Sequence, residues 1–108
     1  MSEDIAPKRV AELLAEGETQ LVDVREPYEH DAGRIAGGTH IELDRLPGEA
    51  ESLDRERPLV FYCRSGSRSA MAADAFRGAG YDAYNMAGGL KAWVESGLPI
   101  EPAGGRVA

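Results

Sequence analysis

The sequence predicts an α/β fold, with a mainly parallel central sheet and helices on both of its faces. Three observations lead to this prediction. Short apolar runs alternate along the chain with segments of helical periodicity. The run 59–62 has four apolar residues in succession, as in a strand that is buried on both faces. Glycine and proline residues lie where these segments begin or end.

The first half of the chain begins with an amphipathic helix. Pro7 is suited to its first turn, and Gly17 to its end. Val10, Leu13 and Leu14 fall on one face between them. The elements that we expect next are a strand over 21–24, a short helix over 27–32 that ends at Gly33, a brief strand or extended segment over 40–43, and a short helix over 47–53.

The second half contains the elements that are predicted most clearly. These are the strand over 59–62, a helix over 67–79 ended by Gly80, a strand over 82–86, and a last helix over 90–96, preceded by Gly88-Gly89 and stopped by Gly97. In the long helix, the residues that we expect on one apolar face are Ala70, Met71, Ala75 and Phe76. Trp93 has helical spacing from Leu90 and Val94, which indicates a core residue.

The length of 108 residues suits a single domain over 1–108. Residues 102–108 contain Gly104-Gly105 and no apolar pattern, so we expect a loose tail there. A net charge of −7 argues against a nucleic-acid binder and against docking on an anionic membrane. No stretch approaches the length of a membrane span. A monomer is the simplest expectation.

The single cysteine, Cys63, cannot form an internal disulfide, so the sequence gives no sign of an oxidising compartment. The acidic start of the chain lacks the apolar run of a secretory signal. We therefore expect a cytoplasmic protein. His30 and His40 have no ligand-like spacing with each other or with Cys63, so we expect neither a metal site nor a cofactor.

The loop after the most apolar strand carries the residues suited to chemistry. Cys63 follows that strand directly, and the loop leads into the N-terminus of the long helix. Gly66 permits a tight turn, while the helix offers unpaired N–H groups and the positive end of its dipole. Successive loop N–H groups can also converge on an anion. With Arg64 and Arg68 nearby, this setting predicts a lowered pKa for the Cys63 thiol.

A lone cysteine after an apolar strand is more often a small core residue. The company of two arginines, two serines and a glycine argues against that interpretation here. Ser65 and Ser67 are better suited to loop donors and a helix cap than to nucleophiles, because no histidine base is placed near them. Gly88-Gly89 on its own is a weak sign of phosphate binding, and a turn explains it.

Three separated segments of the chain resemble the rhodanese family. The N-terminal signature is matched by Leu21-Val22-Asp23-Val24-Arg25-Glu26, Tyr28-Glu29 and Gly33-Arg34-Ile35-Ala36-Gly37-Gly38. The active-site loop is matched by Cys63-Arg64-Ser65-Gly66-Ser67-Arg68-Ser69. The C-terminal signature is matched by Met86-Ala87-Gly88-Gly89-Leu90, Trp93 and Gly97-Leu98-Pro99. The resemblance runs from about residue 5 to residue 100. The family often has His at Arg34 and Pro at Ala36, and we expect Arg34 to face solvent.

The resemblance implies a rhodanese-like domain and a thiosulfate sulfurtransferase. Cys63 would be the catalytic residue, alternating between thiol and persulfide. The donor would be thiosulfate or a similar small anion, and the acceptor cyanide, a thiol or a protein. The residues that would bind the transferred sulfur or the donor are Arg64, Ser65, Gly66, Ser67 and Arg68, although Arg68 could instead brace the loop. The resemblance also implies that Arg25 pairs with a carboxylate and fixes neighbouring loops.

Two other functions remain open. The domain could relay persulfide sulfur from a partner protein to another protein, with thiosulfate only a laboratory substrate. A phosphatase or arsenate reductase is less favoured, because cysteine phosphatases have five residues between the cysteine and the arginine. Here four residues separate Cys63 from Arg68, which suits a sulfur atom better than a phosphate.

Overall fold

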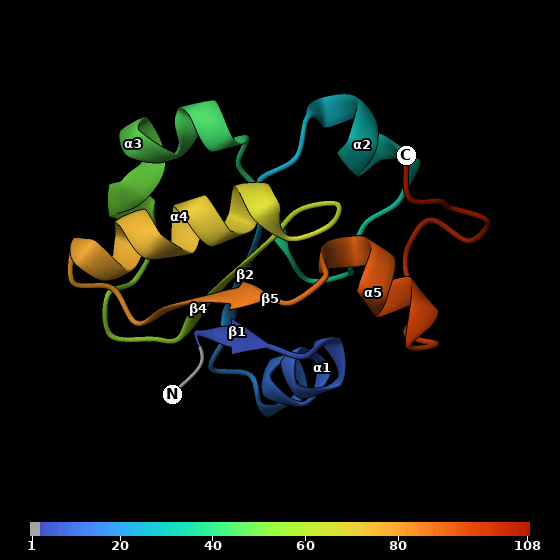
Figure 1. The fold of residues 1–108 in the computed structure, drawn as a ribbon, viewed down its shortest axis with the longest axis horizontal. Helices are drawn as coiled ribbons and strands as arrows, with labels where there is room; N and C mark the ends of the chain where they lie inside the picture. Colours follow the sequence, from blue (N-terminus) through green and yellow to red (C-terminus); the bar gives the residue numbers. More distant parts are fainter. Residues whose placement is uncertain (1–2) are drawn as a thin grey trace.

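The sheet is the centre of the molecule in the computed structural model, which describes residues 3–108 (Figure 1). Its five strands lie in the order β1-β5-β4-β2-β3, and every neighbouring pair is parallel. The strands are β1 (Asp4–Ile5), β2 (Gln20–Asp23), β3 (Thr39–His40), β4 (Leu59–Tyr62) and β5 (Ala83–Met86). The predicted α/β class is therefore confirmed.

Helices cover both faces of the sheet, as predicted (Figure 1). They are α1 (Pro7–Glu16), α2 (Pro27–Ala32), α3 (Leu46–Glu49), α4 (Ser67–Gly78) and α5 (Gly89–Glu95), with 3-10 turns η1 (Leu43–Arg45) and η2 (Ala50–Ser52). One apolar cluster joins the sheet to α3 and α4 and includes Phe61 and Phe76. A second cluster joins the opposite face to α1 and α5 and includes Val60 and Trp93. Alternate residues of β4 thus serve opposite faces.

Most predicted elements lie where the glycine and proline residues of the sequence predicted their ends. Pro7 begins α1, and Gly17 ends it in the left-handed conformation with φ of 88°. Two predictions need correction, and one strand lies where none was expected. The helix expected over 47–53 is broken into α3 and η2, with η1 before it. The brief strand or extended segment expected over 40–43 is the strand β3 at 39–40, and η1 already begins at residue 43. The strand β1 is the one that was not expected. These pieces are two to four residues long, too short for a periodicity to be read from sequence.

The apolar face expected for the long helix is partly wrong. Phe76 is buried as predicted, but the residues buried beside it in α4 are Ser69, Ala72 and Ala73. Met71 is 61% exposed, and Ala75 is exposed as well. Small residues occur all around α4, so hydrophobicity does not identify its buried face. The contacts of Ser69, described below, show which face meets the sheet.

Residues 102–108, for which we expect a loose tail, contact the rest of the chain in the structure. The segment lies against α2, where the N–H of Arg106 donates to the carbonyl oxygen of Ala32 at 2.8 Å. Val107 packs against the second apolar cluster. Just before it, Arg34 and Glu101 form an antiparallel bridge. These contacts join residues far apart in sequence, which local composition does not reveal.

A groove of about 610 Å³ lies between α3 and α4. It is lined mostly by apolar side chains, among them Leu46, Met71, Phe76 and Tyr81. Neither Cys63 nor the loop after it contributes to its walls. Within residues 3–108, no helix combines the length and apolar character that crossing a bilayer requires.

Candidate active site

Cys63 lies at the carboxyl end of β4, which is flanked by β2 on one side and β5 on the other. Cys63 is only 1% exposed. The chain leaves the sheet there and returns as α4, which begins at Ser67. Sites in open parallel sheets lie beyond such strand ends. The position of the loop agrees with the sequence prediction.

Polar groups surround the sulfur of Cys63. The N–H of Gly66 donates to Sγ at 3.1 Å, and the N–H of Ser69 lies 3.5 Å from it. The Ser69 hydroxyl lies 3.3 Å from the same sulfur. Gly66 has φ of 108°, a left-handed conformation that turns its N–H back toward Cys63 and that other residues adopt only with strain. The short loop therefore wraps its own donors around one sulfur atom.

Two opposing effects set the acidity of Cys63. Burial raises the pKa of the thiol, because it disfavours the charged form. Hydrogen bonds from the Ser69 hydroxyl and from the backbone N–H groups of Ser69, Gly66 and Ser65 act in the other direction. The donors outweigh burial, so the pKa of Cys63 is lowered from its ordinary value of 9.0. A cysteine that only filled the core would lack these donors.

The N-terminus of α5 supports the back of the loop. The N–H of Leu90 donates to the carbonyl oxygen of Cys63 at 2.8 Å, and the N–H of Lys91 donates to that of Arg64 at 3.0 Å. These bonds pair two N–H groups that a helix N-terminus leaves free. They also hold the loop carbonyls on the α5 side, away from the sulfur. Gly89, with φ of 63°, allows this approach, since a Cβ there would lie 2.5 Å from the Arg64 carbonyl oxygen.

Arg68 braces the loop through an ion pair with α2. Its two terminal nitrogens donate to the two carboxylate oxygens of Glu29 at 2.8 and 2.9 Å. Glu29 is buried, and its carboxylate also accepts from the N–H of Glu26 at the start of α2. The hydrogen bonds from Arg68 lower the pKa of Glu29, although burial opposes them. Of the two roles that the sequence left open for Arg68, this geometry matches the bracing role.

A second ion pair, in which both side chains are buried, lies at the end of β2 beside the loop. Arg25 donates to both carboxylate oxygens of Asp23, at 2.8 and 2.7 Å, and to the carbonyl oxygen of Gly33 at 2.7 Å. The expected pairing of Arg25 with a carboxylate is thus confirmed, and it ties β2 to the end of α2. Burial raises the pKa of Asp23, but hydrogen bonds from Arg25 and His30 lower it further, and the net direction is downward.

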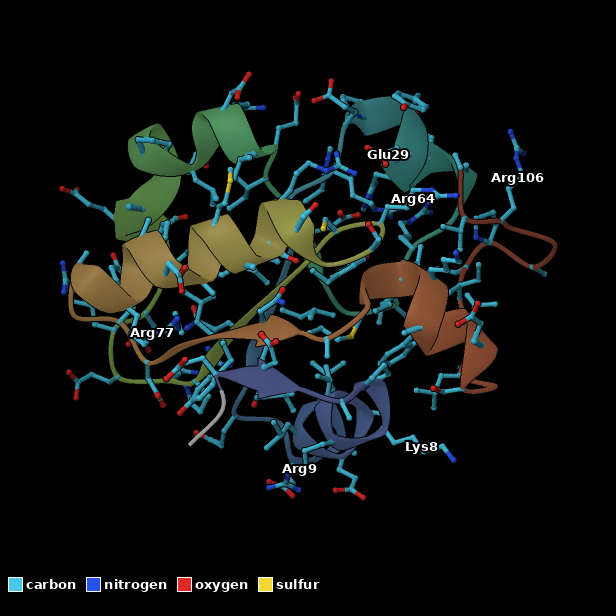
Figure 2. The ribbon with its side chains drawn as sticks, in the orientation of Figure 1. Lys8, Arg9, Glu29, Arg64, Arg77 and Arg106 are labelled. Atoms are coloured by element: carbon cyan, nitrogen blue, oxygen red, sulfur yellow. The ribbon has the colours of Figure 1, made fainter. Side chains whose placement is uncertain are left out.

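The other residues predicted for the site lie around the loop. Arg64, Ser65 and Ser67 are exposed and line its outer rim. Gly66, not Ser67, occupies the cap position of α4, which corrects the expectation of a serine cap. Figure 2 shows Arg64 at the same end of the molecule as Glu29, whereas Arg77 lies at the opposite end.

Arg34 does not simply face solvent as expected. Its guanidinium donates to the carbonyl oxygen of His30 at 3.2 Å and lies 3.8 Å from the carboxylate of Glu101.

His30 and His40 stack with ring centroids 4.3 Å apart. Among residues 3–108, no three His, Cys, Asp or Glu side chains are arranged to hold a metal ion.

Three residues of the site have roles that the sequence did not reveal: Glu29, Ser69 and Asn85. Ser69 contacts the sulfur directly, and Asn85 contacts Ser69. Glu29 and Ser69 both occur within the quoted signatures, which was the available signal. Asn85 lies in β5 and reaches the site only because β5 neighbours β4 in the sheet.

Known proteins are similar to this chain over most of its length. The model of the rhodanese-like domain matches residues 6–96. A sulfurtransferase of Allochromatium vinosum is 34% identical over 102 residues, which cover 93% of this chain and 95% of that protein. The thiosulfate sulfurtransferase GlpE of Pseudomonas aeruginosa is 36% identical over 90 residues, covering 82% of this chain and 81% of GlpE.

Solved structures agree with these sequence matches. A rhodanese-related protein of Thermoplasma volcanium superposes with a TM-score of 0.84 at 28% identity, covering 91% of this chain and 96% of that one. A rhodanese-like domain protein of Staphylococcus aureus gives a TM-score of 0.81 at 31% identity, covering 94% and 100%. With the family's three signatures in order on this fold, and its domain model matched over most of the length, the chain belongs to the rhodanese-like domain family.

Proposed function

We propose that this protein is a sulfurtransferase that carries sulfane sulfur as a persulfide on Cys63, with thiosulfate or a similar small anion as donor. One observation carries the proposal. The buried Sγ atom of Cys63 accepts hydrogen bonds from the loop, and these lower the pKa of the thiol despite its burial. A thiolate is the nucleophilic form of cysteine, so it needs no general base. Relatives named sulfurtransferase support the same chemistry.

The first half of the reaction loads the sulfur. The Cys63 thiolate attacks the outer sulfur of thiosulfate, and a new S–S bond forms to Sγ. The S–S bond of thiosulfate breaks, and its electron pair leaves on sulfite. The product is a Cys63 persulfide whose negative charge lies on the outer sulfur. The loop N–H groups between Arg64 and Arg68 are the donors that we assign to this charge.

The second half unloads the sulfur. Cyanide or a thiolate attacks the outer sulfur, the persulfide S–S bond breaks, and Cys63 returns as thiolate. Cyanide leaves as thiocyanate, and a thiol acceptor leaves as a persulfide. Both halves transfer one sulfur atom without an external oxidant or reductant, and the chain needs no cofactor for them. A reducing compartment such as the cytoplasm suits a thiol that must stay free.

We assign different tasks to the two arginines of the loop. Arg64 is exposed at the rim, where its charge can attract an anionic donor. Arg68 is bound through both terminal nitrogens to Glu29, so it positions the loop. A phosphatase is disfavoured for the same reason, since Arg68 is not free to turn into the loop and bind a phosphate in two places.

Intact-protein mass spectrometry after thiosulfate treatment tests the proposal. The wild-type protein should gain the mass of one sulfur atom, and cyanide should remove it with release of thiocyanate. Cys63→Ser should gain nothing while its circular dichroism spectrum stays unchanged. No sulfur adduct on the wild-type protein would overturn thiosulfate as donor. An adduct formed only from a persulfidated protein donor would instead indicate a sulfur relay between proteins. Hydrolysis of an aryl phosphate that is faster than sulfur transfer from thiosulfate to cyanide would indicate a phosphatase.

A further inference from the structure

The Ser69 hydroxyl has one proton and several acceptors within reach. Its oxygen lies 2.5 Å from Oδ1 of Asn85, 3.3 Å from the carbonyl oxygen of Gly66 and 3.3 Å from Sγ of Cys63. A hydroxyl donates one hydrogen bond at a time. Asn85, Gly66 and Cys63 are all buried, so water does not readily donate a hydrogen bond to them in place of Ser69. These three acceptors therefore compete for a single proton, and Asn85 is the nearest of them.

The orientation of the Asn85 amide decides which of its atoms faces Ser69. The Nδ2 group of Asn85 donates to a carboxylate oxygen of Asp4 in the neighbouring strand β1 at 3.2 Å. An ionised carboxylate only accepts hydrogen bonds, so it selects the NH2 end of the amide. The Oδ1 end is then the one that faces Ser69. Asp4 and Asn85 are register partners in the β1–β5 pair, which places the two side chains together.

We propose that Asn85 is a positioning residue that competes with Cys63 for the hydroxyl proton of Ser69. When the sulfur is a neutral thiol, or carries the outer sulfur of a persulfide, the hydroxyl donates to Asn85. When Cys63 is a thiolate, the hydroxyl rotates and donates to Sγ. The rotation makes and breaks no covalent bond. Its cost is the lost bond to Asn85, so Asn85 opposes ionisation of Cys63 through Ser69.

The proposal predicts opposite effects for the two side chains. Ser69→Ala removes a donor to the thiolate and should raise the pKa of Cys63 by about one unit. Asn85→Ala removes the competing acceptor and should lower that pKa by roughly half to one unit. In the double variant Ser69→Ala/Asn85→Ala, the proton for which the two groups compete is gone. The double variant should therefore behave like Ser69→Ala alone.

Other charged groups near Cys63 are not substituted in any of these variants, although Asp4 loses its donor Asn85 in the Asn85 variants, with or without Ser69. They are Arg68 of α4 with its partner Glu29 of α2, the Asp23–Arg25 pair at the end of β2, and Asp4 of β1 behind Asn85. Arg68 interacts electrostatically with the Cys63 thiolate. A change that depends on Ser69 therefore cannot be assigned to these groups.

The rate of iodoacetamide alkylation as a function of pH measures the pKa of Cys63. Cys63 is the single cysteine of the chain, so the rate reports on this thiol alone. The matched controls are Tyr84→Phe, which removes a hydroxyl from the same strand as Asn85, and Ser96→Ala, which removes one from the end of α5. Both should titrate like the wild type. Asn85→Val, which suits a strand and has no acceptor, replaces Asn85→Ala if that variant does not fold.

An unchanged or raised pKa in the folded Asn85 variants would overturn the inference, and so would an Asn85 effect that persists without Ser69. The inference rests on the proposed function only in assigning the thiolate to sulfur transfer. The two can fail separately, because alkylation needs no sulfur donor. The alkylation profiles could follow these predictions while the protein gains no sulfur from any donor. That result would support the proton competition and overturn the proposed sulfurtransferase function.

Discussion

Arg64 and Arg68 flank the same loop but lie in different surroundings. The side chain of Arg64 is exposed, and its Nε donates a hydrogen bond to the carbonyl oxygen of Ala108 at 3.2 Å. The side chain of Arg68 is 32% exposed and is held by the carboxylate of Glu29, which is 4% exposed. Removing Arg68 leaves that buried carboxylate without its ionic partner, whereas removing Arg64 exposes nothing new. The two arginines carry the same charge, but we expect their removal to affect stability unequally.

We expect Arg68→Ala to lower the free energy of unfolding by about 1–3 kcal/mol, less than for a fully buried pair because solvent reaches Arg68. Arg64→Ala should change it by less than about 0.5 kcal/mol and should raise the KM for thiosulfate. Urea titration and steady-state kinetics of both variants measure these effects. An Arg64→Ala variant with an unchanged KM would contradict a contact between Arg64 and the donor.

At the scale of elements, the loop depends on the contact between α5 and β4. Leu90 and Lys91 bind the carbonyl oxygens of Cys63 and Arg64, so the start of α5 fixes the direction of two loop peptides. Gly89 makes the contact possible, because its missing Cβ leaves room for both carbonyl groups. At the other end of the same helix, Gly97 is also left-handed, but nothing lies within 4 Å of a Cβ built there.

These two glycines form a matched pair for mutation. Gly97→Ala should cost about 1–2 kcal/mol of stability, the usual strain of an alanine in the left-handed region, and should leave sulfur transfer unchanged. Gly89→Ala should cost about 2–5 kcal/mol, since a clash is added to that strain. It should also slow persulfide formation by displacing the loop. Thermal unfolding and the rate of the mass gain test this, and similar behaviour of both variants would contradict the role of α5.

At the scale of the whole molecule, two ion pairs with buried carboxylates connect the sheet with the helices around the loop. Asp23–Arg25 joins β2 to the end of α2, and Glu29–Arg68 joins α2 to α4. The pKa values of Asp23 and Glu29 are both lowered from their ordinary values of 3.8 and 4.5. A lowered folded-state pKa means that the unfolded chain binds protons first as the pH falls. The stabilisation from these carboxylates is therefore complete above about pH 5 and is lost progressively below it.

We expect the free energy of unfolding to fall as the pH drops from about 5 toward 3. Glu29→Gln should be less stable at neutral pH and should lose less on acidification, because one of the two contributing carboxylates is gone. Asp31→Asn is the control, since it removes an exposed carboxylate from the same helix and should retain the wild-type slope. Urea titrations at a series of pH values measure the slopes. A Glu29→Gln slope equal to that of the wild type would contradict this account.

The local sequence determined the elements whose patterns are local. Pro7, Gly17 and the apolar run of β4 mark their elements because helix punctuation and strand burial act within a few residues. Cys63, Gly66 and the arginines identified the loop for the same reason. The short pieces β1, β3 and α3 were missed or misplaced, because two to four residues do not form a recognisable period.

The way in which distant residues meet around the sulfur depends on the tertiary fold. It brings Glu29 of α2 to Arg68, the start of α5 to the carbonyl groups of the loop, and Asn85 of β5 to Ser69. It also set the buried face of α4, where alanines on all sides gave no periodic signal. These contacts depend on which strands are neighbours in the sheet, a property of the whole chain. Local residue types are enough to identify the cysteine loop, whereas the donors, ion pairs and competing acceptors around it follow from the fold.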